Sequence, residues 1–205
     1  MRLKSFHIMA ATLMLLLIST EFVIAGPAGE QVKQTVDRVV AIVADPALKG
    51  EAKQQERRRK LKEILYASFD FNEMAKRSLG SHWQKRSPEE QKEFVQLFTE
   101  VLESAYLDKL ESYKGEKVRY LNERQEADFA EVSTKVIDGK GEELSLNYRL
   151  HSVNGDWKVT DVVVENISLV NNYRAQFNRV LAKSSYGELV QAMKQKKLSA
   201  PGVDS

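Results

Sequence analysis

The spacing of apolar residues changes once along this chain of 205 residues, and that change limits what the chain can fold into. Before Gly115, apolar side chains recur every three or four residues, as on one face of an α-helix. Over residues 117–164 they alternate with polar side chains, as on the two faces of a strand. A helical pattern returns after Ser168. This order predicts an α+β protein in which helices wrap around a curved antiparallel sheet.

Two helices are predicted over residues 30–44 and 51–66. Asp45 and Pro46 end the first, because the residue before a proline avoids helical angles. The second is charged on most faces, and its run over residues 56–60 favours a solvated surface over a basic binding patch. Valines form the apolar face of the first helix: Val32, Val36, Val39, Val40 and Val43.

The stretch over residues 69–113 combines strong helix starts with a high density of large apolar side chains. Ser87 and Glu90 match a capping box, in which each side chain bonds the backbone N–H of the other residue. They predict a helix over residues 88–112, whose wide apolar face suits packing on a sheet. A shorter helix is predicted over residues 70–79.

The alternating segment predicts four strands, over residues 117–126, 129–137, 142–153 and 157–164. Asn154 and Gly155 are a strong signal for a two-residue hairpin turn. The run Val162-Val163-Val164 predicts either a strand covered on both faces or a β-bulge. In the third strand, one face carries Leu144, Leu146, Tyr148 and Leu150.

The first residues match a secretory signal peptide. Arg2 and Lys4 give a positive start, and residues 8–20 form an apolar run too short to span a bilayer comfortably. Small or medium side chains at the −3 and −1 positions favour cleavage after Ala25, with cleavage after Ala28 as the alternative.

Removal of residues 1–25 is expected to leave residues 26–205 as a single domain, long enough for a sizeable core. The formal net charge of +2 argues against a nucleic-acid binder, which usually has a strong basic excess. The chain contains no cysteine, so an exported form has no disulfides. A bacterial periplasmic protein tolerates this absence.

The sequence carries no motif for metal binding, phosphate binding or nucleophilic catalysis. His82 and His151 are far apart and lack supporting ligands, so no metal or other cofactor is expected. Asp161 and Glu165 lie in or beside an apolar strand, where a buried carboxylate could act as a general base. We favour a structural role for them, by pairing with a cation such as Arg149 or by bonding the start of the last helix.

Two long blocks stand out: FDFNEMAKRSLGSHW followed by SPEEQKEFVQLFTEVLESAY, and NYRLHSVNGDWKVTDVVVENISLVNNYRAQFNRVL. They resemble the MlaC-type periplasmic phospholipid carriers, also called the toluene-tolerance family. The resemblance extends over nearly all of residues 30–197. Asn166 stands where we expect a glycine, and asparagine tolerates left-handed backbone angles, so the same turn is expected.

The resemblance implies a helical shell on a four-stranded antiparallel sheet, shaped like a nuclear-transport-factor-like cone. It implies a deep apolar pocket for phospholipid acyl chains, with the head group left in water and no enzymatic activity. Two acyl chains call for a pocket near or above the upper end of the ~300–1,000 Å³ range of ligand sites.

The resemblance also implies partners in a lipid-asymmetry pathway. These are an inner-membrane ABC transporter with a lipid-binding MCE-domain subunit, an outer-membrane lipoprotein complex, and transient contact with membrane surfaces.

The residues expected to line the pocket come from the matching blocks and from the alternating strands. They are Phe71, Met74, Leu79, Trp83, Phe94, Phe98, Leu102, Tyr106, Leu146, Tyr148, Leu150, Trp157, Val159, Val163 and Tyr173. Periodicity alone does not separate a filled core from a cavity lined by the same residue types.

Two other functions stay open on the sequence alone. One is a cone-shaped isomerase or dehydratase with Asp161 as its base. The other is a periplasmic adaptor that has a filled core and binds only protein.

Overall fold

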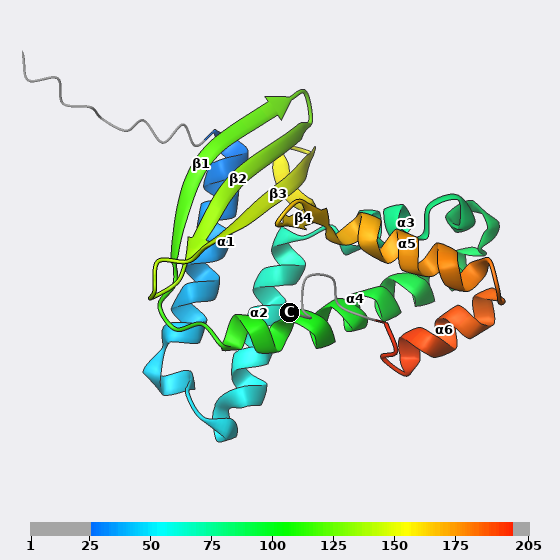
Figure 1. Cartoon of the computed structure of the whole chain (residues 1–205), viewed down its shortest axis with the longest axis horizontal. Helices are drawn as coiled ribbons and strands as arrows, with labels where there is room; N and C mark the ends of the chain where they lie inside the picture. Colours follow the sequence, from blue (N-terminus) through cyan, green and yellow to red (C-terminus); the bar gives the residue numbers. More distant parts are fainter. Residues whose placement is uncertain (1–25, 199–205) are drawn as a thin grey trace, which may run out of the picture.

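The computed structural model describes residues 26–198, so the predicted signal peptide lies outside the described residues. In chain order the helices are α1 (Pro27–Ala44), α2 (Gln54–Ser68), α3 (Phe71–Leu79), α4 (Pro88–Glu111), α5 (Leu169–Leu181) and α6 (Tyr186–Lys194) (Figure 1). The strands are β1 (Lys117–Glu126), β2 (Phe129–Ile137), β3 (Glu143–Val153), β4 (Asp156–Val164) and β5 (Ile167–Ser168). This confirms the predicted α+β fold, with the expected helices and strands starting within three residues of their predicted positions.

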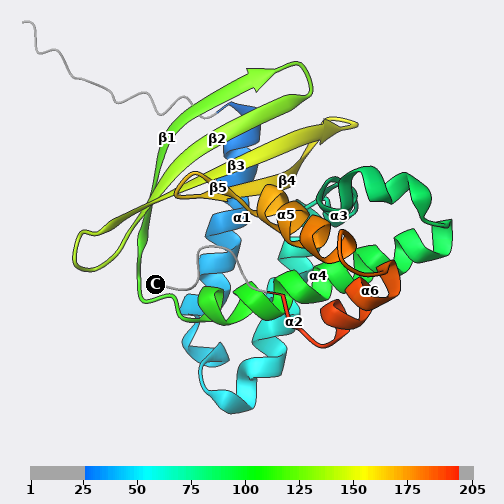
Figure 2. The same cartoon turned by 45° about the vertical axis from the view of Figure 1, so that its right-hand side comes forward.

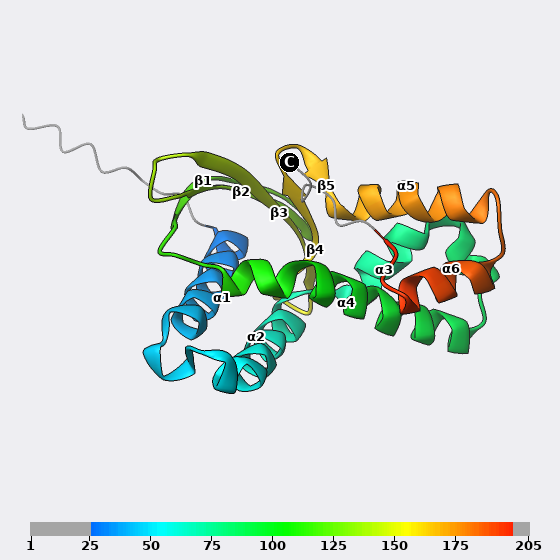
Figure 3. The ribbon, with the colours of Figure 1, turned by 60° about the horizontal axis from the view of Figure 1, so that its bottom comes forward.

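The five strands form one antiparallel sheet in the order β1-β2-β3-β4-β5, which curves over α1 (Figure 3). Prediction gave four strands, and β5 adds a fifth of only two residues, too short to leave a periodic signal. The turn before β5 places Glu165 and Asn166 at φ of 45° and 66°. Asn166 therefore keeps the left-handed turn expected at this position.

The helix starts follow from their capping residues. Ser87 and Glu90 form the predicted capping box of α4, and the Asp70 side chain accepts a hydrogen bond from the backbone N–H of Glu73 at the start of α3. Ser168 caps α5 in the same way. These caps fix where each helix leaves the sheet or the preceding turn.

The helices α3, α5 and α6 pack with the first half of α4 on one side of the molecule, away from α1 (Figure 2). Their interface is filled by aromatic rings. Phe94 and Phe98 pack against Tyr173 and Phe177 with ring centroids 5.4–6.2 Å apart. We call this cluster the helical core. A second cluster, the sheet core, joins the start of α1 to the inner face of the sheet.

The long helix α4, of 24 residues, connects the two regions. Its first half lies in the helical core, and its second half passes under the sheet (Figure 3). One end of α4 therefore packs in a filled core, and the other end lies beneath the inner face of the sheet.

The basic run of α2 is less solvated than predicted. Arg57 Nε donates to a Glu111 carboxylate oxygen at 2.7 Å, and both side chains are largely buried, 14% and 8% exposed. Arg58 bonds the same carboxylate, and Arg57 also donates to the Leu48 carbonyl. Two of the arginines thus hold α2 against the end of α4, while Arg59 stays on the exposed face.

Candidate functional site

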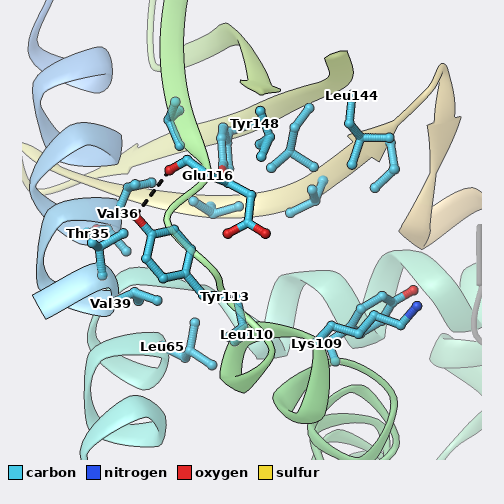
Figure 4. A pocket seen from close by; sticks show the side chains of 18 of the residues that line it. Thr35, Val36, Val39, Leu65, Lys109, Leu110, Tyr113, Glu116, Leu144 and Tyr148 are labelled. Atoms are coloured by element: carbon cyan, nitrogen blue, oxygen red, sulfur yellow. Dashed lines mark hydrogen bonds between the residues drawn. The ribbon is translucent and has the colours of Figure 1, made fainter. Parts of the chain in front are cut away.

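An apolar cavity lies between the inner face of the sheet and helices α1, α2 and α4 (Figure 4). Its volume is about 670 Å³, which is within the range of small-molecule sites but below the size that we expect for two acyl chains. Valine, leucine, phenylalanine and tyrosine side chains make up most of its wall, with a smaller number of polar and charged side chains among them. A long apolar ligand in the cavity would contact apolar side chains along most of the ligand's length.

The valine face of α1 forms one wall of the cavity. Val32, Val36, Val39, Val40 and Val43 all line it. The sequence shows these valines on one helical face, but none is among the predicted pocket residues. The missed signal is a stripe of five β-branched residues on a helix outside the blocks that carry the resemblance.

Strands β2, β3 and β4 form the opposite wall. Leu144, Leu146 and Tyr148 point inward from β3, as its alternating pattern predicts. Burial raises the pKa of Tyr148 well above its usual value, so the phenol stays neutral. The middle of β3 therefore presents an uncharged surface to the cavity.

Side chains from the helices complete the wall. Leu102, Tyr106 and Leu110 come from the second half of α4, where three- and four-residue spacings place them on one face. Phe71 and Met74 come from α3. Burial raises the pKa of Tyr106 as well, so its phenol is also neutral.

The few polar groups inside the wall have partners. Thr35 Oγ1 lies 3.0 Å from Ser68 Oγ and donates to the Gln31 carbonyl oxygen. Glu103 pairs with Lys62 at 2.7 Å and accepts a hydrogen bond from the Tyr66 hydroxyl. These contacts leave the interior without an uncompensated charge of its own.

Charged residues gather where the cavity opens. Lys109 and Leu144 lie at the end of the cavity away from the α1 valines (Figure 4). Asp138, Glu142 and Glu143 come from the β2–β3 turn and the start of β3, which adjoin this end. The cavity thus runs from an apolar interior to a polar opening.

The start of β1 also borders the cavity. Tyr113 Oη donates to the Glu116 carbonyl oxygen at 3.1 Å, shown as the dashed line in Figure 4. This hydrogen bond holds the short segment between α4 and β1 beside the valine wall.

Seven of the fifteen predicted residues line the cavity: Phe71, Met74, Leu102, Tyr106, Leu146, Tyr148 and Val159. The other eight lie outside it, and each has a physical reason. Leu79, Phe94, Phe98 and Tyr173 are fully buried in the helical core, and Trp83 packs against it. Leu150 and Trp157 point inward but belong to the sheet core near the start of α1.

Val163 is the eighth, and a β-bulge accounts for it. Arg149 pairs with Asp161, but Leu150 pairs with Val159, so Thr160 is an extra residue in β4. The extra residue reverses the alternation, so that Val159, Val162 and Val164 face the cavity and Val163 does not. Val162 and Val163 point to opposite faces of β4 and are both buried, so the valine run reflects a strand that is covered on both faces, one of its two predicted causes. The bulge, the other predicted cause, lies at Thr160, before the run.

Asp161 is buried and bonded on the side of β4 away from the cavity. Its carboxylate accepts hydrogen bonds from Ser168 Oγ at 2.6 Å, the Val170 N–H at 3.1 Å and Arg149 Nη1 at 3.3 Å. This confirms the structural interpretation, pairing with Arg149 and bonding at the start of α5. Because Asp161 does not line the cavity, it is not placed as the base that an isomerase or dehydratase requires.

The two histidines of the described region lie apart. His151 stacks on Phe129 with ring centroids 4.9 Å apart, and His82 lies in the turn before α4. Between residues 26 and 198, no group of three or more His, Asp or Glu side chains is arranged to hold a metal ion. None of the helices in that range is both long and apolar enough to cross a membrane.

A curved sheet with helices around an open apolar cavity is typical of a protein that binds a small amphipathic or apolar ligand. The chain belongs to the MlaC protein family, whose sequence model matches residues 33–195.

Two relatives show where the similarity lies. The intermembrane phospholipid transport system binding protein MlaC of Haemophilus influenzae is 26% identical over 122 residues, and the aligned region spans 57% of each protein. The phospholipid-binding protein of Ralstonia solanacearum, solved in complex with a phospholipid, is 28% identical with a TM-score of 0.74. That comparison covers 83% of this chain and 97% of the solved one.

Proposed function

We propose that this protein is a periplasmic carrier that binds a phospholipid in the apolar cavity and moves it between the inner and outer membranes. The observation that carries the proposal is the cavity itself, on a fold shared with a protein solved with phospholipid bound. The acyl chains lie against the α1 valines and the inner face of β3. The head group stays at the polar opening.

The energetics of lipid exchange support this assignment. Each exposed CH₂ costs about 0.8 kcal/mol in water, so a free phospholipid does not cross an aqueous gap at a useful rate. A cavity as apolar as the bilayer makes exchange nearly balanced in free energy. Such a carrier needs no catalytic group, and its direction of transport is set elsewhere.

The partners that we propose rest on membership of the MlaC family. The carrier receives or delivers lipid at an inner-membrane ABC transporter with an MCE-domain subunit and at an outer-membrane lipoprotein complex. It is exported with the help of residues 1–25 and has no enzymatic activity.

A vesicle-transfer assay tests the carrier function. Donor vesicles hold a self-quenched fluorescent phospholipid, acceptor vesicles hold none, and the protein is added in soluble form. A transfer rate that rises in proportion to protein concentration supports the proposal. An adaptor gives no transfer above background, and an enzyme gives a chemically altered lipid on extraction.

A further inference from the structure

The cavity wall contains a single cationic side chain among the described residues, that of Lys109. It belongs to α4, where residues 102, 106 and 109 follow one another at three- and four-residue spacings and all line the cavity. Leu102 is buried in the interior, 7% exposed, while Lys109 is exposed at the opening. The same helical face thus leads from the apolar interior to one positive charge.

Lys109 is not engaged by the acidic residues around it. Glu103 pairs with Lys62, and Glu143 pairs with Arg119 and Lys135. Across residues 26–198, the Lys109 ammonium makes no ion pair or hydrogen bond. Figure 4 shows Lys109 on the far side of the cavity from the valine wall, and its side chain is exposed.

The other cavity residues near the opening repel an anion or are neutral. Glu116, Asp138 and Glu142 are acidic, and Asp138 accepts the backbone N–H groups of Lys140 and Glu142. Lys109 is therefore the one wall side chain with a charge that attracts a phosphate.

We propose that Lys109 binds the phosphate group of the lipid and so selects phospholipids over neutral lipids with the same acyl chains. This proposal rests on the proposed function. A phosphodiester lies where the acyl chains leave the cavity, and the free ammonium lies at that level. Because Lys109 is solvent-exposed, its contact with phosphate changes affinity by about two- to fivefold, within the usual range for exposed charged contacts.

A competition experiment tests the proposal with two defined lipids. The lipid-free protein is mixed with vesicles that contain equal amounts of phosphatidylethanolamine and of diacylglycerol with identical acyl chains. Native mass spectrometry then gives the ratio of the two complexes. Wild type is expected to favour the phospholipid about two- to fivefold, and 0.5 M salt is expected to reduce that preference.

Two variants assign the preference to Lys109. Lys109→Gln is expected to bring the ratio close to one while leaving diacylglycerol uptake unchanged, because the apolar wall is intact. Lys114→Gln removes a nearby exposed lysine that does not line the cavity, and it is expected to behave as wild type. Circular dichroism confirms that both variants are folded.

The outcomes separate this inference from the function on which it rests. Equal uptake of the two lipids by wild type, or an unchanged preference in Lys109→Gln, overturns the role of Lys109 but not the carrier. Failure of wild type to take up either lipid overturns the carrier function itself.

Discussion

Replacing Leu146 by glutamate places a carboxyl group in the middle of the cavity wall. Leu146 points inward from β3 and is only partly buried, because the cavity lies in front of it. The variant should therefore fold, with the carboxylate in contact with water inside the empty cavity. A bound acyl chain excludes that water, and the carboxyl must then become neutral.

Neutralising the carboxyl has a free-energy cost that depends on pH. A glutamate has an ordinary pKa of about 4.3, so protonating it at pH 7 costs about 2.7 pH units of 1.36 kcal/mol each, or about 3.7 kcal/mol. Phospholipid affinity should therefore fall about 500-fold at pH 7 and only about 16-fold at pH 5.5. The loss should shrink tenfold for each pH unit, because proton uptake is coupled to lipid binding.

Fluorescent-phospholipid titration at several pH values measures this effect. Leu146→Gln has a similar size without the titrating group, so its affinity should show no such pH dependence. Asn147→Glu adds the same charge to the opposite face of β3 and should bind as wild type. Normal binding by Leu146→Glu at pH 7, or an equal loss of affinity in Asn147→Glu, would contradict the position of Leu146 in the lipid-binding wall.

Three further predictions concern the parts of the molecule that support the cavity. Phe98→Ala should lower the free energy of unfolding in urea by about 3–5 kcal/mol, because it empties the filled helical core, and a loss under 1 kcal/mol would contradict that packing. Arg57→Ala should cost about 2 kcal/mol by leaving the buried Glu111 with one partner fewer, whereas Arg59→Ala in an exposed pair should cost less than about 0.5 kcal/mol. Burial raises the pKa of Tyr173 to about 12, above its value of about 10 in the unfolded chain. The buried neutral phenol therefore contributes up to about 2.7 kcal/mol to the free energy of unfolding, which is present below pH 10 and is lost as the pH rises towards 12. Tyr173→Phe should reduce this alkaline loss in denaturation curves, and an unchanged curve would count against the burial of the phenol.

The secondary structure was accessible from the sequence because its signals are local. Capping residues mark the helix starts, and alternation marks the strands, including the turn at Asn154 and Gly155, whose φ values are both positive. The strand β5 escaped prediction because two residues carry no period.

The cavity was harder to predict, because the periodicity of an apolar helix face does not show whether that face borders a filled core or an open cavity. The apolar face of α4 is continuous in sequence, yet Phe94 and Phe98 lie only in the helical core, while Leu102 and Tyr106 also line the cavity. The valines of α1 gave a clear helical face but no sign of an open space opposite.

Register is the other limit. A single extra residue, Thr160, turns Val163 away from the cavity and brings Val162 and Val164 to it. The sequence offered a bulge or a strand covered on both faces as explanations for the valine run. The strand is buried on both faces, and only the strand pairing shows that a bulge also precedes the run.

Native mass spectrometry of the protein purified without detergent, followed by lipid extraction, tests whether the cavity carries a phospholipid. We expect a mass increment of one phospholipid, which returns when emptied protein is incubated with phospholipid vesicles. A protein that carries no lipid on purification and also takes up none from vesicles would contradict it.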